Sequence, residues 1–166
     1  MSNAILLKQH GVDEDLKPLL IEVEEQPVGK YYKAEFNPDF PPIPSFRPEL
    51  FIYASLVPGS VSIIGRYHEA DVFYQITIII DQKLGSGTYP IKKGDESRVR
   101  ASVIASGGWL HADNGEIKLE RKREQNNTKE SIYAEFDFQI ESGGKPHKVK
   151  GRLELLASGP LDKPAQ

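Results

Sequence analysis

The feature that most constrains this chain is an apolar run near its middle, residues 73–80, with the sequence FYQITIII. Its residues are mainly aromatic or β-branched, and such side chains fit a pleated, half-buried strand better than a helix. The run is also too short for a surface helix of ordinary length. We therefore predict a central β-strand here, and the rest of the chain must pair with this strand or pack across from it.

Weaker two-residue alternation continues on both sides of this run, and Gly, Asn, Asp and Pro separate the segments. The first two predicted strands, 19–24 and 31–36, flank the turn sequence QPVG and form a hairpin. Residues 4–17 fit either one helical turn or an edge strand. The remaining predicted strands are 51–56, 60–65, 88–91, 98–105, 109–112, 116–120, 132–140 and 148–155.

Glycine and proline indicate how these strands connect. An Asn-Gly pair accepts the left-handed angles of a type I′ turn, so residues 113–115 predict a hairpin between 109–112 and 116–120. Residues 142–144, with the sequence SGG, predict a second turn. The Pro-rich segment 37–48 cannot enter a sheet interior, because each proline lacks a backbone donor. We predict a stiff, polyproline-like connection there.

The last two predicted strands carry opposite charges on their polar faces. Glu135 and Asp137 alternate with apolar residues on one strand, and Lys148, Lys150 and Arg152 do so on the other. Cross-strand pairs of opposite charge contribute roughly 0.2–1 kcal/mol each. We therefore expect these strands to pair with their charges in solvent. The facing cations would keep both carboxylates ionised, which favours ion pairs over a catalytic acid and base.

Short strands, frequent turn signals and no convincing helix predict an all-β fold with little or no helix. An antiparallel β-sandwich is favoured over the alternative, a closed β-barrel of lipocalin-like size. The reason is that the Pro-containing segments 37–48 and 88–91 are typical of sheet crossings or edges. We expect one β domain over 1–166: an N-terminal hairpin with the Pro-rich connection (1–48), a main meander (49–158) and a mobile tail (159–166).

Composition narrows the classes of function. The chain has 166 residues, 39% hydrophobic and 27% charged, and no apolar run approaches the ~20 residues of a membrane helix. A net charge of −3 gives no general attraction to nucleic acid or anionic lipid. The absence of cysteine excludes disulfides and thiolate chemistry. We expect a cytoplasmic protein, or alternatively an exported one whose signal has been removed, with neither nucleic acid nor membrane as a partner.

The second half of the chain also carries a resemblance. The order I-x-I from Ile76, then GTY at 87–89, G-x-I-x-L at 115–119, A-x-F-x-F at 134–138 and V-x-G-x-L at 149–153 resembles small bacterial all-β domains of unknown function. Many of those are lipoprotein-like β-sandwich families. The resemblance implies the fold and no activity. This chain departs from the lipoprotein pattern, because it has no cysteine to lipidate.

Motifs for chemistry are sparse. The histidines His10, His68, His111 and His147 lack the i,i+2 or i,i+4 spacing of a metal site, so we expect neither metal nor cofactor. Asp113 beside His111 is better explained by the predicted turn than by an oriented base. The basic run 121–123 lies between glutamates without aromatics, which favours a solvated hairpin tip over a nucleic-acid contact.

Aromatic residues provide the remaining candidate site. Trp109, beside two glycines, could line a ligand pocket with Tyr53, Tyr67, Tyr74 and His111. The favoured hypothesis is a non-enzymatic binding or interaction module for a protein, a glycan or a small apolar molecule, with no catalytic residues. The alternatives are a structural protein that forms homo-oligomers through the edge strand at 88–91, and an enzyme with a fold-assembled site near His111.

Overall fold

The structure is a computed structural model that describes residues 3–19, 31–40, 43–46, 48, 50–69, 72–94, 97–105, 108–123, 130–159 and 161. One short helix and a series of strands make up this part of the chain. They are α1 (Asn3–Gln9), β1 (Tyr31–Phe40), β2 (Ile43–Phe46), β3 (Leu50–Ala54), β4 (Ser60–Glu69), β5 (Val72–Asp81), β6 (Gly87–Lys92), β7 (Val99–Ala105), β8 (Gly108–His111), β9 (Asn114–Arg123), β10 (Glu130–Ser142) and β11 (Lys145–Leu156).

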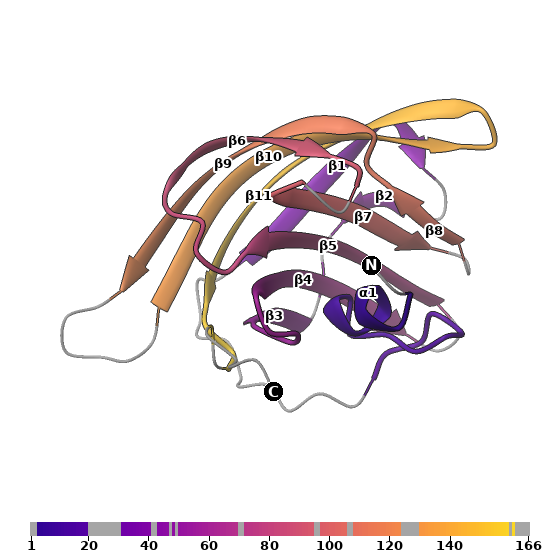
Figure 1. Cartoon of the computed structure of the whole chain (residues 1–166). Coiled ribbons are helices and arrows are strands. Elements are labelled where there is room, and N and C mark those ends of the chain that lie inside the picture. Colours follow the sequence, from indigo (N-terminus) through magenta and orange to yellow (C-terminus); the bar gives the residue numbers. More distant parts are fainter. Residues whose placement is uncertain are drawn as a thin grey trace.

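Two antiparallel sheets pack face to face as a β-sandwich. One sheet has six strands in the order β2-β1-β11-β10-β9-β6, and the other has five in the order β3-β4-β5-β7-β8. We call them the β11 sheet and the β5 sheet. Figure 1 shows the β11 sheet arching over the β5 sheet, with α1 on the opposite side of the β5 sheet. The predicted sandwich is confirmed, and the barrel alternative is wrong because the two sheets do not join into one ring.

The predicted central strand is the middle strand of its sheet. On β5, Ile76, Ile78 and Ile80 face the core between the sheets, and all are at most 1% exposed. Gln75 and Thr77 point to the outer face, yet both are 0% exposed. A strand buried on both faces reads as a continuous apolar run rather than an alternating one. This double burial explains why residues 73–80 carry no charge, although Gln75 and Thr77 make the outer face polar.

The meander at the end of the chain has the predicted register. Glu135 pairs with Arg152 and Asp137 pairs with Lys150, so the charged faces lie together on the solvent side. Gly143 and Gly144 have φ of 59° and 79° in the turn, as a type I′ hairpin requires. The apolar face of β10 lies in the core. Burial of each Ile or Phe side chain there contributes ~1.5–3 kcal/mol to the stability of the fold. Its core residues are Ile132, Ala134, Phe136, Phe138 and Ile140.

The predicted hairpin at 113–115 is wrong. β8 belongs to the β5 sheet and β9 to the β11 sheet, so the chain crosses between sheets here. Asn114 is already the first residue of β9 and pairs with Gln139. Gly115 serves a different purpose, because a Cβ on it would lie 2.2 Å from the carbonyl oxygen of Asp137. The glycine permits β10 to approach closely rather than a tight turn.

The Pro-rich segment also departs from the prediction. Residues 37–40 continue β1, which pairs with β11, and residues 43–46 form β2 at the edge of the sheet. The polyproline-like connection is therefore wrong for these residues. Pro44 remains compatible with strand because β2 lies at an edge, where a missing donor costs little. Pro38 lies on β1 where its register with β2 shifts, between Glu35 and Phe40. The predicted hairpin partner at 19–24 lies almost entirely outside the described residues.

Both ends of the chain add to the sandwich. Of the two alternatives for residues 4–17, the helical one is correct, since α1 covers Asn3–Gln9. Of the predicted mobile tail, the structure describes only Gly159 and Leu161, and Leu161 packs against the core.

Candidate functional site

The N-terminal segment, residues 3–19, covers the outer face of the β5 sheet (Figure 1). Its backbone is held by polar side chains of the sheet that would otherwise be buried without partners. Ser62 Oγ donates to Gln9 O (2.5 Å), Gln75 Nε2 to His10 O (2.8 Å), and Arg66 Nη2 to Gly11 O (3.0 Å). The part of the outer face that this segment covers is therefore buried.

His10 anchors this segment. Its Nδ1 lies 2.7 Å from the carbonyl oxygen of Leu6, and its Nε2 lies 2.6 Å from Ser102 Oγ. A carbonyl only accepts, so Nδ1 carries the proton and Ser102 donates to Nε2. Trp109 Nε1 in turn donates to Ser102 Oγ at 3.4 Å. Burial lowers the pKa of His10 to about 4, which keeps the imidazole neutral near pH 7.

A cavity of about 340 Å³ lies where this segment meets β5, β7 and β8 and the end of β6. We call it the cationic cavity. One part of its lining is apolar or small: Leu6, Ile79, Gly94, Ala101 and Ala112. The other part is charged or titratable: His10, Lys92, Lys93, Arg100 and His111.

The charge of this lining has one sign. Among the described residues, every charged or titratable side chain that lines the cavity is a cation or an imidazole. Arg100 Nη2 donates to Gln9 Oε1 at 3.1 Å, which ties the guanidinium to the N-terminal segment. Lys93 Nζ lies 2.7 Å from Asp113 Oδ1, outside the lining. Burial first, and then the charges of Lys93 and Arg100, lower the pKa of His111.

The hydrogen bond between His10 and Ser102 has the geometry of a base and a nucleophile, with Leu6 O orienting the imidazole. The burial of Ser102 argues against nucleophilic catalysis by this pair. Ser102 is 1% exposed and does not line the cavity, so no substrate reaches its hydroxyl in this structure. The pair holds the N-terminal segment in place instead.

The five predicted ligand residues lie in three places. Trp109 and His111 contact each other, with ring centroids 4.8 Å apart, and His111 lines the cationic cavity. Tyr67 and Tyr74 stack on each other at 4.7 Å, and Tyr74 packs against the core between the sheets. Tyr53 is 0% exposed and lies in the same core. The structure therefore brings together Trp109 and His111 but not the tyrosines.

Tyr53 belongs to a buried polar group. Its hydroxyl donates to Glu130 Oε2, and Arg121 Nε donates to the same carboxylate at 2.9 Å. Arg121 Nη1 also donates to Gln82 O (3.0 Å) and Leu84 O (2.8 Å), which ties β9 to the turn after β5. The solvated basic tip is therefore wrong at Arg121, whose side chain is 12% exposed.

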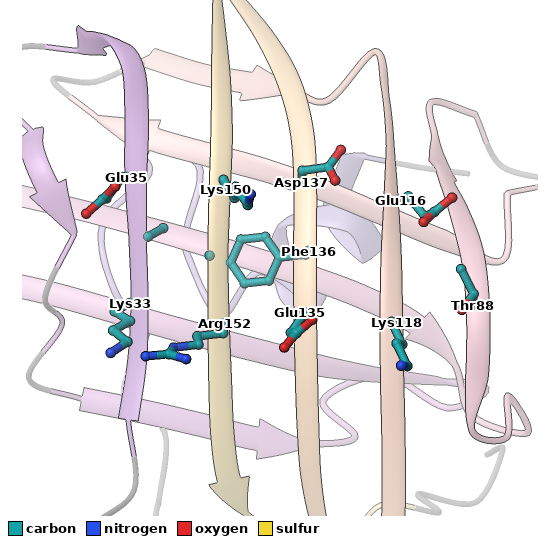
Figure 2. A pocket seen from close by; sticks show the side chains of 12 residues that line it. Lys33, Glu35, Thr88, Glu116, Lys118, Glu135, Phe136, Asp137, Lys150 and Arg152 are labelled. Atoms are coloured by element: carbon teal, nitrogen blue, oxygen red, sulfur yellow. The ribbon is translucent and has the colours of Figure 1, made fainter.

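A second, larger hollow of about 580 Å³ lies on the outer face of the β11 sheet. Figure 2 shows its charged side chains in two rows across the strands. Within the described part of the chain, none of them forms an ion pair within 4.0 Å. Four cations and four carboxylates balance, so this face attracts neither sign of ion. The rows are Lys33, Arg152, Glu135 and Lys118, and then Glu35, Lys150, Asp137 and Glu116.

The sequence pointed to His111 but missed its neighbours. Two signals could have indicated them. The basic turn Lys92-Lys93-Gly94 follows an edge strand, and Arg100 shares one strand face with Ser102 opposite an apolar face. His10 carried no signal, because residues 4–17 had no definite secondary structure from the pattern alone.

Comparison with known proteins does not assign the chain to a family. No protein-family model matches the chain, and neither the curated proteins nor the solved structures include a significant match. The resemblance to bacterial all-β domains therefore stays a prediction. Among the described residues, no group of three metal-ligating side chains is positioned to hold a metal, and no helix is long and apolar enough to cross a membrane.

Proposed function

We propose that this protein is a non-enzymatic binding module whose ligand is a small organic anion bound in the cationic cavity. One observation carries the proposal: the titratable groups described in this lining are all cations or imidazoles, although the chain as a whole has a net charge of −3. A local excess of one sign in a concave, partly apolar site is what complementary ligands require.

The lining also limits the size and shape of the ligand. About 340 Å³ is near the lower end for small-molecule sites, which favours a metabolite-sized molecule. Leu6, Ile79, Ala101 and Ala112 would contact an apolar body, while Lys92 and Arg100 would attract a carboxylate or phosphate group. A charge-assisted hydrogen bond of this kind contributes about 1.5–3 kcal/mol.

The cationic lining favours an anion over the other classes of ligand and over the enzyme alternative. Neither a purely apolar ligand nor a glycan would use the positive charge of this lining. The enzyme alternative has a base and a hydroxyl in His10 and Ser102, but the hydroxyl is buried.

A homo-oligomer is the second candidate, and the position of β6 favours it. β6 is an outer strand of the β11 sheet and, among the described strands, pairs with β9 alone. An unpaired strand edge is a site for pairing with another chain, although Pro90 removes one donor from it. Light scattering tests this candidate: a dimer that Thr88→Lys, a charged substitution at an exposed position of β6, dissociates supports it, and a monomer at all concentrations rejects it.

Calorimetric titration with benzoate tests the anion proposal, with benzamide as the uncharged control of the same shape. We expect benzoate to bind and benzamide not to bind measurably. Arg100→Gln should weaken benzoate binding about tenfold or more, since it removes one charge-assisted hydrogen bond. Lys148→Gln, an exposed charge on the opposite sheet, is the matched control and should leave the affinity unchanged.

Equal binding of benzoate and benzamide would contradict the proposal. So would benzoate binding that falls equally in the Arg100 and Lys148 variants, because the charge effect would then be general rather than local.

A further inference from the structure

His111 occupies a distinctive position in the cationic cavity. It is the last residue of β8, its imidazole is half-buried, and it lines the cavity while its ring contacts Trp109. Among the described residues, the structure records no hydrogen bond to either of its ring nitrogens. A titratable group in a cavity without a protein partner is available to a ligand.

Charged and titratable groups from several neighbouring segments lie around His111. Asp113 is the one carboxylate among them within the described residues, and it is paired with Lys93 at 2.7 Å. Asp95 and Glu96 follow in sequence and lie outside the described residues. The other groups are His10 from the N-terminal segment, Lys92 and Lys93 from the end of β6 and the turn after it, and Arg100 from β7.

We infer that an anion entering the cationic cavity binds together with one proton, which His111 takes up from solvent. This inference rests on the proposed function and goes beyond it, because it names a second ligand of the site. The ligand class becomes an anion whose charge is met by a protonated imidazole as well as by Lys92, Lys93 and Arg100.

The reason lies in the sign of the surrounding charge. Burial and the nearby cations disfavour a positive imidazole, and the pKa of His111 is accordingly lowered. An anion in the cavity offsets those cations and adds a partner of opposite charge, which favours the protonated ring. Binding free energies are reciprocal, so the proton strengthens anion binding by the same factor that the anion strengthens proton binding.

His111 is the proton acceptor rather than His10. Both ring nitrogens of His10 are engaged, Nδ1 with Leu6 O at 2.7 Å and Nε2 with Ser102 Oγ at 2.6 Å. A second proton on His10 would turn Nε2 into a donor and remove the bond that Ser102 gives it. His111 has no such bond to lose within the described residues.

Titration calorimetry with benzoate in two cationic buffers of different ionisation enthalpy measures the proton directly. The difference in apparent enthalpy between the buffers gives the number of protons taken up. We expect net uptake of a fraction of a proton at about pH 6.5, the ordinary pKa of histidine, and an affinity that rises as the pH falls through this region. Benzoate stays ionised throughout this range, as carboxylates do above about pH 5.5.

Two variants separate the outcomes. His111→Gln should still bind benzoate but with no proton uptake and little dependence on pH, whereas Lys93→Gln should bind more weakly with uptake retained. Benzoate binding without proton uptake in the unmodified protein would overturn this inference and leave the proposed function intact. Uptake that persists in His111→Gln would also overturn it, while a lack of any benzoate binding would reject the proposed function itself.

Discussion

At the scale of single residues, His10 links the N-terminal segment to the sheet. Its imidazole accepts a bond from Ser102 on β7 and donates one to Leu6 on α1, so one side chain sets the distance between the two. The same ring contacts Trp109 edge-on, with centroids 4.9 Å apart. The N-terminal segment lines one side of the cationic cavity, and this neutral histidine with both ring nitrogens bonded holds the segment in position.

Acid should therefore weaken the fold through His10. Its pKa is about 4 in the folded protein against 6.5 in the unfolded chain, so the unfolded chain binds more protons between these values. The free energy of unfolding consequently falls as pH drops from about 6.5 to about 4, by on the order of 3 kcal/mol. Denaturant unfolding across this range measures the loss, and His10→Gln should remove that part of it.

The difference between the unmodified protein and His10→Gln gives the contribution of His10 alone, because other acid-sensitive groups contribute equally to both. At neutral pH the variant should be somewhat less stable, since Gln cannot reproduce both bonds of the ring. A parallel loss of stability with acid in both proteins would show that His10 is not buried and neutral as described.

At the scale of elements, the crossing from β8 to β9 is one of the places where the chain passes between the two sheets. Gly115 lies where β9 meets β10, and any Cβ on it would meet the carbonyl oxygen of Asp137 and Cα of Phe138, 2.2 and 2.6 Å away. These atoms belong to the backbone, so the strand pair rather than a flexible side chain would have to shift.

Gly115→Ala should thus destabilise the protein by about 1–3 kcal/mol, the usual cost of overpacking. Thermal or denaturant unfolding measures this change. Gly85→Ala is the matched control, because a Cβ there meets nothing within 4 Å, and its stability should change by less than about 0.5 kcal/mol. Equal effects of the two substitutions would contradict the close approach of β10.

The strands could be predicted from sequence wherever one local pattern determined them. β5 showed continuous β-branched residues, and β10 and β11 showed alternation together with the two glycines of their turn. The Asn114-Gly115 pair misled the prediction because the same dipeptide suits a tight turn and a close strand approach. Only the partner strand, which is distant in sequence, decides between them.

At the scale of the whole molecule, the candidate site is a product of long-range packing. His10 and Ser102 are 92 positions apart, and the cavity draws its lining from α1, β5, β6, β7 and β8. Sequence alone identified Trp109 and His111 as candidates but grouped them with three tyrosines that lie elsewhere. The basic turn at 92–94 and the position of Arg100 on a strand face are local signals, but no local spacing shows that the fold gathers these cations beside His111.

The proposed function requires that a small anion binds between the N-terminal segment and the β5 sheet. A two-dimensional NMR titration of nitrogen-15-labelled protein with benzoate tests this claim most directly, because it locates the bound ligand. We predict saturable shifts of the amide signals of residues 6–10, 92–94, 100–101 and 111–112. Shifts confined to residues 116–118, 135–137 and 150–152 on the opposite sheet, or no saturable shifts at all, would contradict it.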